Sequence, residues 1–374
     1  MQYSDFDSIG RKISKLGFGL MRLPKVSEDS DIIDRDEAFK LIDLAIESGV
    51  NYFDTAYVYH GGDSELFAKE ALSRYPRESY CLATKLPGWA IKEKGKHTDE
   101  LFNEQLEKCG VDYFDFYLLH SVNRDIMKVF EEDNSYEYLA KKKEEGKIRH
   151  LGFSYHGDLE FFIQLIDKYK WDFVQLQINY YDWEATNAKA YYKALEERNI
   201  PCIIMEPVRG GSLHTLNDDA KKVFEELGDN SAASYALRYD LELPDVLTIL
   251  SGMSTYEQVA DNIKTFTEAK PLTDIEKEAI EKANCLFRKN FAIPCTDCKY
   301  CVETCPAGVD IPACFKAYNE YNKTRDVEDF KKVYAEIPEE KRAHNCIECG
   351  ACMEHCPQQI KIPDKLKKVA ELNK

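Results

Sequence analysis

Eight of the 13 cysteines form two sets with identical spacing. Each set follows C-x2-C-x2-C-x3-C and is closed by a proline, and the two sets are Cys295, Cys298, Cys301, Cys305 and Cys346, Cys349, Cys352, Cys356. Two-residue gaps let a chain wrap one edge of an iron–sulfur cube at each step, which favours a [4Fe-4S] cluster. Two other uses of the cysteines are disfavoured. A structural zinc site would need only two C-x2-C pairs, and disulfides are rare in the reducing compartment expected for a chain without a secretory signal.

This spacing is typical of bacterial two-cluster ferredoxins, in which the fourth cysteine of each set binds the other cluster. The resemblance implies two [4Fe-4S] clusters with crossed ligand sets. The first would be held by Cys295, Cys298, Cys301 and Cys356, and the second by Cys346, Cys349, Cys352 and Cys305. The segment between the sets is longer than in compact ferredoxins and has helical patterns, so the domain resembles the helical ferredoxin modules of multi-subunit oxidoreductases. The other cysteines are predicted to be buried thiols without ligands: Cys81, Cys109, Cys202, Cys285 and Cys314.

A second group of polar residues lies at or just after the ends of apolar runs. Asp54 ends Tyr52-Phe53-Asp54, and Tyr59 follows five residues later. Lys85 and His120 each end another such run. A nearby ammonium stabilises a phenolate and lowers the pKa of a phenol, so a lysine beside a tyrosine can make it a proton donor. These four side chains would suit carbonyl reduction, which needs a hydride on carbon and a proton on oxygen.

The elements that position these residues are short apolar strands alternating with amphipathic helices. Eight candidate strands occur before residue 271: Lys15–Gly19, Tyr52–Asp54, Ser79–Thr84, Asp115–Leu119, His150–Phe153, Phe173–Gln177, Cys202–Met205 and Val246–Leu250. They are apolar on both faces, as strands covered on both sides are. Predicted helices such as Asp36–Ser48, Thr98–Cys109 and Tyr136–Glu145 end at glycines.

This alternation predicts a (β/α)8 TIM barrel, although a doubly wound open sheet would show a similar pattern. Residues 1–14 are expected to form a hairpin at the barrel bottom, turning at 8–10, and 272–290 a connecting helix. The predicted domains are therefore a barrel over 1–271 and a small, mainly helical ferredoxin-like domain over 272–374. In such a barrel the strand ends converge on one mouth, which would bring Asp54, Lys85 and His120 together.

Residues 10–270 resemble the aldo-keto reductase family. The resemblance rests on four motifs in order and spacing: Asp54-Thr55-Ala56-Tyr57-Val58-Tyr59, Thr84-Lys85, Leu118-Leu119-His120 and Gly152-Phe153-Ser154. It implies an NAD(P)H-dependent enzyme that reduces an aldehyde or ketone to an alcohol. The implied catalytic residues are Asp54, Tyr59, Lys85 and His120, with Lys85 acting on Tyr59 and His120 orienting the carbonyl.

The same resemblance implies a nicotinamide cofactor pocket. Its implied residues are Gly19, Met21, Ser154, Gln177, Met205, Gly210, Gly211, Gln258 and Asn262. Of these, Ser154 and Gln177 would contact the amide, and Gly210 and Gly211 would approach the pyrophosphate. The chain departs from the family by having Tyr155 for an asparagine and Met205 for a stacking aromatic. Gly252 and Gln258 stand where relatives have cations for the 2′-phosphate, so the choice between NADP(H) and NAD(H) stays open.

Composition narrows the range of partners. The net charge of −17 argues against general binding of nucleic acid or of an anionic membrane. Residues 291–374 contribute 13 basic and 14 acidic residues, so nearly all the negative charge lies before them. Without a secretory signal or an apolar run long enough to span a membrane, the expected location is cytoplasmic.

Three functions remain open at this stage. The first is a carbonyl reductase whose clusters exchange electrons with a partner such as ferredoxin or another redox protein, or serve regulation. The second is an electron-transfer protein in which the barrel binds flavin, because hydride carries two electrons and each cluster passes one. The third is a redox sensor without catalysis, against which the complete set of four polar residues counts.

Overall fold

The computed structural model describes residues 1–6, 8–27, 30–228 and 230–373. These residues form two compact units, and each is considered by itself below. The first unit contains residues 1–207 and 233–272, and the second contains 208–232 and 273–374. Nothing in the sequence predicts that 208–232 groups with the cysteine-rich region.

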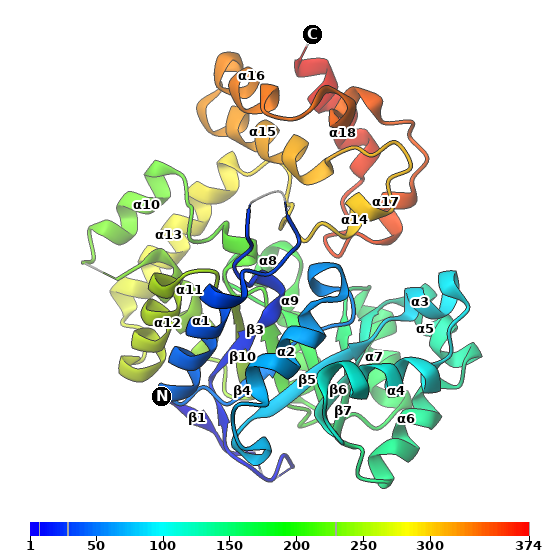
Figure 1. Cartoon of the computed structure of the whole chain (residues 1–374). Coiled ribbons are helices and arrows are strands. Elements are labelled where there is room, and N and C mark those ends of the chain that lie inside the picture. Colours follow the sequence, from blue (N-terminus) through cyan, green and yellow to red (C-terminus); the bar gives the residue numbers. More distant parts are fainter. Residues whose placement is uncertain (7, 28–29, 229, 374) are drawn as a thin grey trace. The chain divides into compact units, whose positions relative to one another are not determined.

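The first unit is a closed barrel of eight parallel strands, which confirms the predicted (β/α)8 fold (Figure 1). The strands are β3 (Leu16–Gly19), β4 (Tyr52–Asp54), β5 (Cys81–Leu86), β6 (Phe114–Val122), β7 (Ile148–Tyr155), β8 (Phe173–Gln177), β9 (Cys202–Met205) and β10 (Val246–Gly252). Closure occurs where β10 pairs with β3 in register, Gly252 beside Gly19. An open sheet is therefore excluded, and the strand ends meet around one mouth.

The predicted hairpin also forms, and it closes the other end of the barrel. β1 (Tyr3–Ser4) pairs antiparallel with β2 (Ile13–Ser14), and the Ser4 hydroxyl donates a hydrogen bond to the carbonyl of Leu247. Apolar side chains from the hairpin and strands, such as Ile13, Phe116 and Phe173, fill the interior there. The barrel is thus a packed core at this end, and polar chemistry is left to the other.

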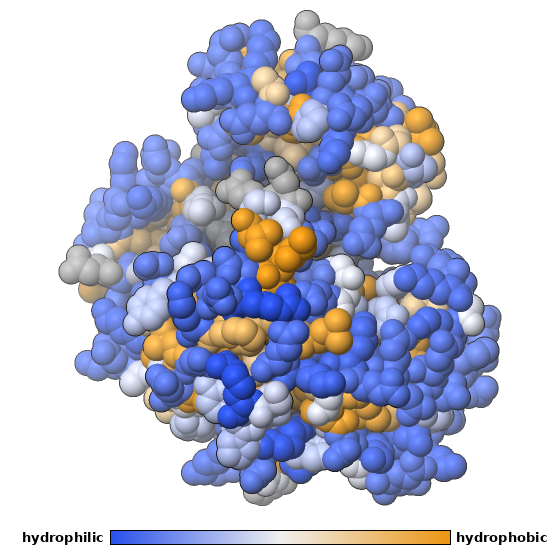
Figure 2. Space-filling model, in the orientation of Figure 1, coloured by the Kyte–Doolittle hydropathy of each residue, from blue (hydrophilic) through white to orange (hydrophobic). Residues whose placement is uncertain are grey.

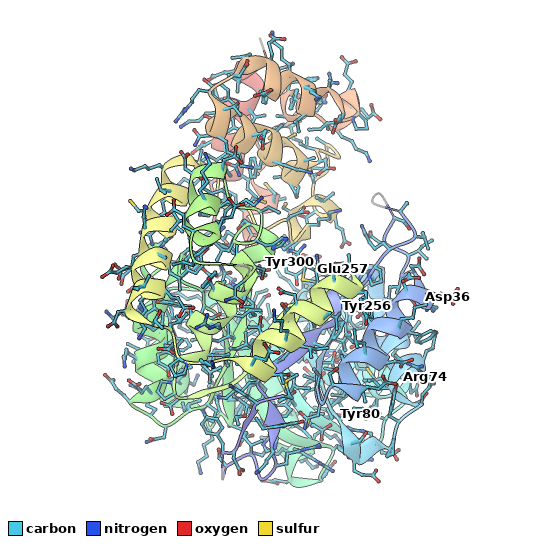
Figure 3. The ribbon with its side chains drawn as sticks, turned by 90° about the vertical axis from the view of Figure 1, so that its left-hand side faces the viewer. Asp36, Arg74, Tyr80, Tyr256, Glu257 and Tyr300 are labelled. Atoms are coloured by element: carbon cyan, nitrogen blue, oxygen red, sulfur yellow. The ribbon has the colours of Figure 1, made fainter. Side chains whose placement is uncertain are left out.

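Helices surround the strands. They are α1 (Arg35–Glu47), α2 (Ser64–Leu72), α3 (Gly88–Lys94), α4 (Thr98–Cys109), α5 (Arg124–Glu132), α6 (Ser135–Glu144), α7 (Leu159–Lys168), α8 (Asp182–Ala185), α9 (Ala188–Glu196), α11 (Ala232–Leu241) and α12 (Tyr256–Glu268). α4 ends at Gly110, whose φ of 64° is easily adopted by glycine. α1 packs against α12, so the ring of helices closes where the ring of strands does; Asp36 and Tyr256 mark the beginnings of these helices in Figure 3.

The second unit consists of helices and loops. Its helices are α10 (Asp218–Glu225), α13 (Asp274–Asn290), α14 (Tyr300–Glu303), α15 (Ile311–Thr324), α16 (Val327–Ala335), α17 (Ala351–Glu354) and α18 (Ile362–Leu372). α13 begins in a capping box between Thr273 and Glu276 and packs against α10. Phe315, Phe330 and Leu366 belong to a separate apolar core that also contains the predicted ligands Cys301 and Cys352.

Short 3-10 helices complete the described structure: η1 (Leu20–Arg22), η2 (Tyr59–Gly62), η3 (Arg77–Ser79), η4 (Arg209–Gly211), η5 (Glu339–Lys341) and η6 (Ala343–Asn345). Hydrophilic side chains cover most of the face seen in Figure 2, as expected for a chain with 31% charged residues. Among the described residues, no helix is both long and apolar enough to cross a membrane.

Candidate functional site

Strand register places the predicted catalytic side chains on the inner face of the barrel. Asp54 of β4 pairs with Ala83 of β5, and Lys85 lies one pleat further along the same face. Lys85 pairs in turn with Leu118 of β6, so His120 again lies one pleat further. Each polar residue therefore lies two residues further along its own strand than the residue paired with the polar residue of the strand before it.

Lys85 is the centre of this group. Its Nζ atom lies 2.5 Å from Oδ1 of Asp54, 2.7 Å from the carbonyl oxygen of Thr55 and 3.3 Å from the hydroxyl oxygen of Tyr59. Lys85 is 1% exposed and Asp54 3%. Burial lowers the pKa of Lys85, while Asp54 acts in the opposite direction and favours the ammonium. The arrangement points a buried, carboxylate-held amine at the Tyr59 phenol.

His120 completes the group beside Tyr59. The two rings meet edge to face with centroids 6.3 Å apart, and both residues are buried. Burial, followed by repulsion from Lys85, lowers the pKa of His120 well below its usual range. A neutral imidazole is therefore favoured, and it can donate one hydrogen bond to a carbonyl oxygen.

A buried polar network behind Lys85 had no signal in the sequence. Gln105 of α4 donates from Nε2 to the Lys85 carbonyl at 3.1 Å and to Glu65 of α2 at 2.5 Å. Glu65 also accepts from the Thr84 hydroxyl, and Gln105 accepts from the Tyr117 hydroxyl at 2.6 Å. This network joins β5 and β6 to α2 and α4, and so fixes the strand that carries Lys85.

Among the predicted cofactor contacts, Ser154 of β7 and Gln177 of β8 belong to hydrogen-bonded groups. The Ser154 hydroxyl oxygen accepts from the backbone N–H of Ser121 at 2.8 Å. The Gln177 amide nitrogen donates to Asp182 at 2.7 Å, and Asp182 also accepts from Asn179 at 2.8 Å. Asp182 and Asn179, which sequence reasoning missed, thus orient the Gln177 side chain.

Tyr155 and Met205, two residues that depart from the family pattern, have defined surroundings in the first unit. Tyr155 lies outside the barrel interior, packed against Phe162 and Tyr191, and its hydroxyl donates to the Asp158 carbonyl. It therefore serves the packing of α7 and α9. Met205 ends β9 with its sulfur 3.4 Å from the amide nitrogen of Gln175.

The remaining predicted contacts of the first unit lie near the closure of the barrel. Gly19 ends β3 and pairs with Asp54, and Met21 lies in η1. Asn262 of α12 is buried and donates to the Ser251 hydroxyl at 2.9 Å. Gln258 accepts from the backbone N–H of Ser254 at 2.8 Å.

Arg22, which sequence analysis did not single out, lies beside Gly252. A Cβ atom on Gly252 would come within 3.0 to 3.1 Å of the Arg22 side chain, which therefore occupies the space beside this glycine. The carbonyl of Arg22 also accepts a hydrogen bond from the Ser254 hydroxyl at 2.7 Å. The side chain of Arg22, from η1, therefore packs beside the end of the last strand.

Gly210 and Gly211 lie in η4 of the second unit, after Arg209. Arg209 is fully buried, and its Nη2 donates to the carbonyl of Pro294 at 3.2 Å and to the side chain of Gln358 at 3.1 Å. These two acceptors flank the predicted ligands Cys295 and Cys356. Sequence patterns gave no sign of this contact, which joins residues far apart in the chain.

The two cysteine sets share one backbone conformation. Left-handed residues recur at three matched positions, with φ values of 54° and 55° at Asp297 and Glu348 and of 63° and 81° at Lys299 and Gly350. The third pair, Gly308 and Gln359, has φ values of 64° and 50°. Such φ values are uncommon for residues other than glycine, so their repetition indicates a constraint imposed on both loops.

The structure also brings the two sets close together. Burial, and after it the thiolates of Cys298, Cys295, Cys356 and Cys352, raise the pKa of Cys301. Burial, followed by the thiolates of Cys346, Cys305 and Cys349, raises the pKa of Cys352 to about 11. The short helices α14 and α17, which carry Cys301 and Cys352, pack against each other.

Within the described residues, no three His, Cys, Asp or Glu side chains converge on one point as ligands of a single metal ion. Each thiolate of a [4Fe-4S] cluster binds a different iron, so cluster ligands need not converge in this way. Of the other five cysteines, Cys81, Cys109, Cys202 and Cys314 are buried as predicted. The prediction is wrong for Cys285, which α13 exposes to solvent.

Comparison with known proteins agrees with both units. The family model described as the aldo/keto reductase family matches residues 15–284, and that of a 4Fe-4S dicluster domain matches residues 294–360. The chain is 27% identical over 301 residues to an uncharacterised oxidoreductase, YqkF, of Bacillus subtilis, covering 72% of this chain and 92% of the relative. It is 25% identical over 295 residues to the NADH-specific methylglyoxal reductase of Escherichia coli, covering 67% and 89%.

Solved structures of aldo-keto reductases have the same fold as the barrel. The holo form of aldo-keto reductase AKR11C1 from Bacillus halodurans superimposes with a TM-score of 0.63 at 27% identity, covering 76% of this chain and 96% of that one. A thermostable aldo-keto reductase, Tm1743, superimposes with a TM-score of 0.62 at 23% identity, covering 76% and 100%.

Proposed function

Because the chain belongs to the aldo/keto reductase family and its second unit contains a 4Fe-4S dicluster domain, we propose that it reduces an aldehyde or ketone to an alcohol with NADPH or NADH. Two [4Fe-4S] clusters exchange electrons with a redox partner in this proposal. The reductase function belongs to residues 1–271 and cluster binding to 272–374.

The observation that carries this proposal is the contact between Lys85 and Tyr59. Tyr59 donates its hydroxyl proton to the carbonyl oxygen of the substrate, leaving a phenolate 3.3 Å from the Lys85 ammonium. Asp54 holds that ammonium in place, and His120 orients the carbonyl oxygen with the single N–H of its neutral imidazole. Since all four groups are buried, water competes weakly and the interaction between the charges is strong.

The residues present fit a nicotinamide cofactor. Ser154 and Gln177 offer a hydroxyl and an amide to a carboxamide, and Asp182 holds the Gln177 amide in place. Arg22 offers one cation near the Ser251–Ser254 segment, where the adenosine end would lie. When bound, the reduced cofactor supplies the hydride that the carbonyl carbon receives.

The cysteines fit two [4Fe-4S] clusters with crossed ligands. The first is proposed to be held by Cys295, Cys298, Cys301 and Cys356, and the second by Cys346, Cys349, Cys352 and Cys305. The support is the repeated left-handed backbone and the proximity of the two sets: Cys356 and Cys352 contribute to the raised pKa of Cys301, and Cys305 contributes to that of Cys352. Clusters of this type pass single electrons, which gives the second unit a role distinct from hydride transfer.

The direct test is turnover by the anaerobically purified full chain with reconstituted clusters. Aldehydes and ketones of different size are offered with NADPH or NADH, and the alcohol formed is measured together with cofactor oxidation. We expect one alcohol per cofactor oxidised. A flavin absorption band in the purified protein, with no alcohol formed from any carbonyl compound, would instead support the flavin-based electron-transfer function.

A further inference from the structure

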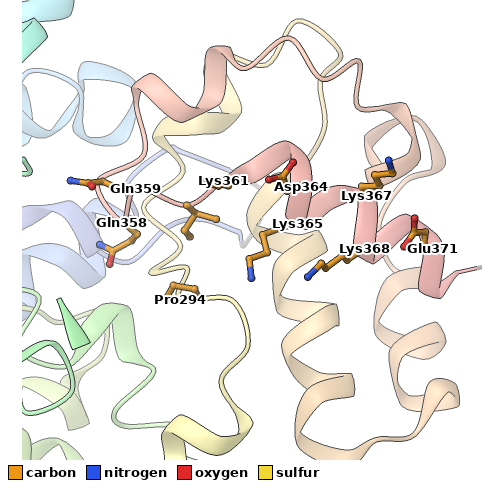
Figure 4. Close-up of a pocket in the computed structure, with 10 residues that line it drawn as sticks. Pro294, Gln358, Gln359, Lys361, Asp364, Lys365, Lys367, Lys368 and Glu371 are labelled. Carbon is orange, nitrogen blue, oxygen red and sulfur yellow. The ribbon is translucent and has the colours of Figure 1, made fainter. Parts of the chain in front are cut away.

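The second unit has an open groove along helix α18. Its volume is about 670 Å³, and Figure 4 shows the residues that line it. Lysines from α18 and its N-cap dominate one wall, namely Lys361, Lys365, Lys367 and Lys368. Pro294 and Gln358 lie toward the end of the groove where α18 begins. We call this feature the lysine groove.

The lysine groove carries a local excess of positive charge. Lys361, Lys365 and Lys368 follow an i, i+4, i+7 spacing, which places them on one face of the helix. Asp364 and Glu371 also line the groove, leaving an excess of two positive charges. Among the ion pairs of the described residues, none involves these four lysines. In a chain of net charge −17, this concentration of unpaired lysines is a distinct surface.

The end of the lysine groove near the start of α18 borders residues next to the proposed first cluster. Pro294 immediately precedes Cys295, and Gln358 follows Cys356 by two residues. Arg209 donates hydrogen bonds to the carbonyl of Pro294 and to the side chain of Gln358, so the two flanking segments are held together. A molecule seated in the groove would therefore contact residues within two positions of two ligands of one cluster.

We infer that the lysine groove is the docking site for a small acidic protein that carries a one-electron cofactor. The inference rests on the proposed binding of [4Fe-4S] clusters. In the transfer, the docked partner is oxidised by one electron, which passes to the cluster held by Cys295, Cys298, Cys301 and Cys356; no bond is made and no proton moves. Reversal of the same step returns the electron to an oxidised partner.

The form of the groove favours a protein over a small anion. Lys361 to Lys368 span about 10 Å of helix at 1.5 Å per residue, which spreads the charge over two turns. Three of the four lysines are exposed, and a hydrated ammonium on a flexible stem acts mainly through long-range attraction. Such surfaces speed the association of oppositely charged proteins, and salt weakens the effect.

The test measures electron transfer from a dithionite-reduced, acidic plant-type ferredoxin to the full chain with both clusters in place. Stopped-flow absorbance gives the second-order rate at several salt concentrations. The variant is Lys365→Glu with Lys368→Glu, and the control is Lys316→Glu with Lys332→Glu on α15 and α16. Both pairs change the charge equally, and the control pair is exposed and does not line the groove.

We expect the rate for the wild type to fall with salt, and the groove variant to lose roughly tenfold at low salt while the control changes less than about twofold. Equal losses in both variants, or a rate independent of salt, would overturn the inference. A second variant, Ile347→Asp with Met353→Gln, changes exposed residues that flank ligands of the second cluster. A loss of rate in this variant and not in the groove variant would also overturn the inference. Loss of ADP binding by the groove variant, measured by calorimetry, would reassign the groove to a small anion.

Failure of the docking inference can be distinguished from failure of the proposed function. Iron, sulfide and NADPH-dependent carbonyl reduction are measured on the same preparations. A chain that holds both clusters and reduces carbonyls, yet does not react with ferredoxin, contradicts the docking site alone. A chain that binds no iron contradicts the proposed clusters, on which the docking inference rests.

Discussion

The amine of Lys85 lies 3.3 Å from the hydroxyl of Tyr59 and is also hydrogen-bonded to Asp54 and to the carbonyl of Thr55. The lysine is therefore held from behind and directed at the phenol. This geometry suits a tyrosine that releases a proton during reduction, because the resulting phenolate is formed next to a buried cation.

Replacing Tyr59 with phenylalanine is expected to lower kcat/KM for carbonyl reduction by about 10²- to 10⁴-fold, the usual contribution of a general acid. Cofactor affinity, measured by fluorescence titration, should stay within about twofold because the ring is kept. Tyr57→Phe is the matched control, since the Tyr57 hydroxyl is bonded to Glu104. Activity of Tyr59→Phe within about threefold of wild type would remove Tyr59 from the mechanism.

The dependence of kcat/KM on pH is expected to be that of an enzyme in which His120 is neutral. Burial and Lys85 hold the pKa of His120 well below 6.5, so the imidazole stays uncharged as pH falls through that value. We expect kcat/KM to show no loss of activity from protonation of His120 between about pH 6 and 8. The profile of His120→Asn provides the comparison. An acidic limb with a pKa near 6.5 in the wild type that disappears in this variant would contradict the expectation.

Cofactor discrimination is expected to be weak, with NADPH favoured by less than about tenfold, or about 1.4 kcal/mol. Gly252 and the neutral Gln258 offer no charge, which leaves Arg22 as the cation beside this segment. A partly exposed ion pair contributes about 0.5–1 kcal/mol, so Arg22→Gln should weaken NADPH binding about two- to fivefold and leave NADH binding unchanged. Arg198→Gln serves as control, and the dissociation constants decide. Equal weakening of both cofactors would show that Arg22 does not recognise the phosphate.

The crossed assignment of ligands predicts how pairs of cysteine substitutions combine. The wild type should hold about eight iron and eight sulfide after anaerobic reconstitution. Replacing Cys295 and Cys356 together with alanine should leave about four iron, because both belong to one cluster. Replacing Cys295 and Cys305 together should leave almost none. The opposite result would establish uncrossed sets, and Cys285→Ala controls for the loss of an exposed thiol.

Arg209→Met should make one of the two clusters labile. The substitution keeps much of the buried volume but removes the bonds to Pro294 and Gln358, which hold the flanks of Cys295 and Cys356. We expect about half of the iron to be released faster to a chelator, followed by absorbance. Arg342→Met, which breaks contacts with the Ile337 and Ala335 carbonyls, is the control. Uniform release of all iron from both variants would indicate general destabilisation.

The sequence by itself determined the alternation of buried strands and helices, because strands buried on both faces leave continuous apolar runs and helix ends leave glycines, whereas the closure of the barrel was decided by the pairing of β10 with β3. β8 and β9 were predicted to the residue, and β4 likewise. Lys85, Asp54 and His120 could be found for the same reason, since a polar residue at the end of an apolar run stands out locally, although β5 and β6 continue one and two residues beyond Lys85 and His120. The cysteine spacing is local too, and it pointed to a dicluster domain before any fold was known.

Tertiary structure alone decided which distant residues support those sites. Gln105 and Glu65 behind Lys85, Asp182 behind Gln177 and Arg22 against Gly252 lie on helices or loops whose patterns look ordinary. Arg209 binds residues 85 and 149 positions away, and segment 208–232 joins the second unit. Contacts of this kind depend on how elements pack in three dimensions. Periodicity records only whether a side chain is buried, and not which partner buries it.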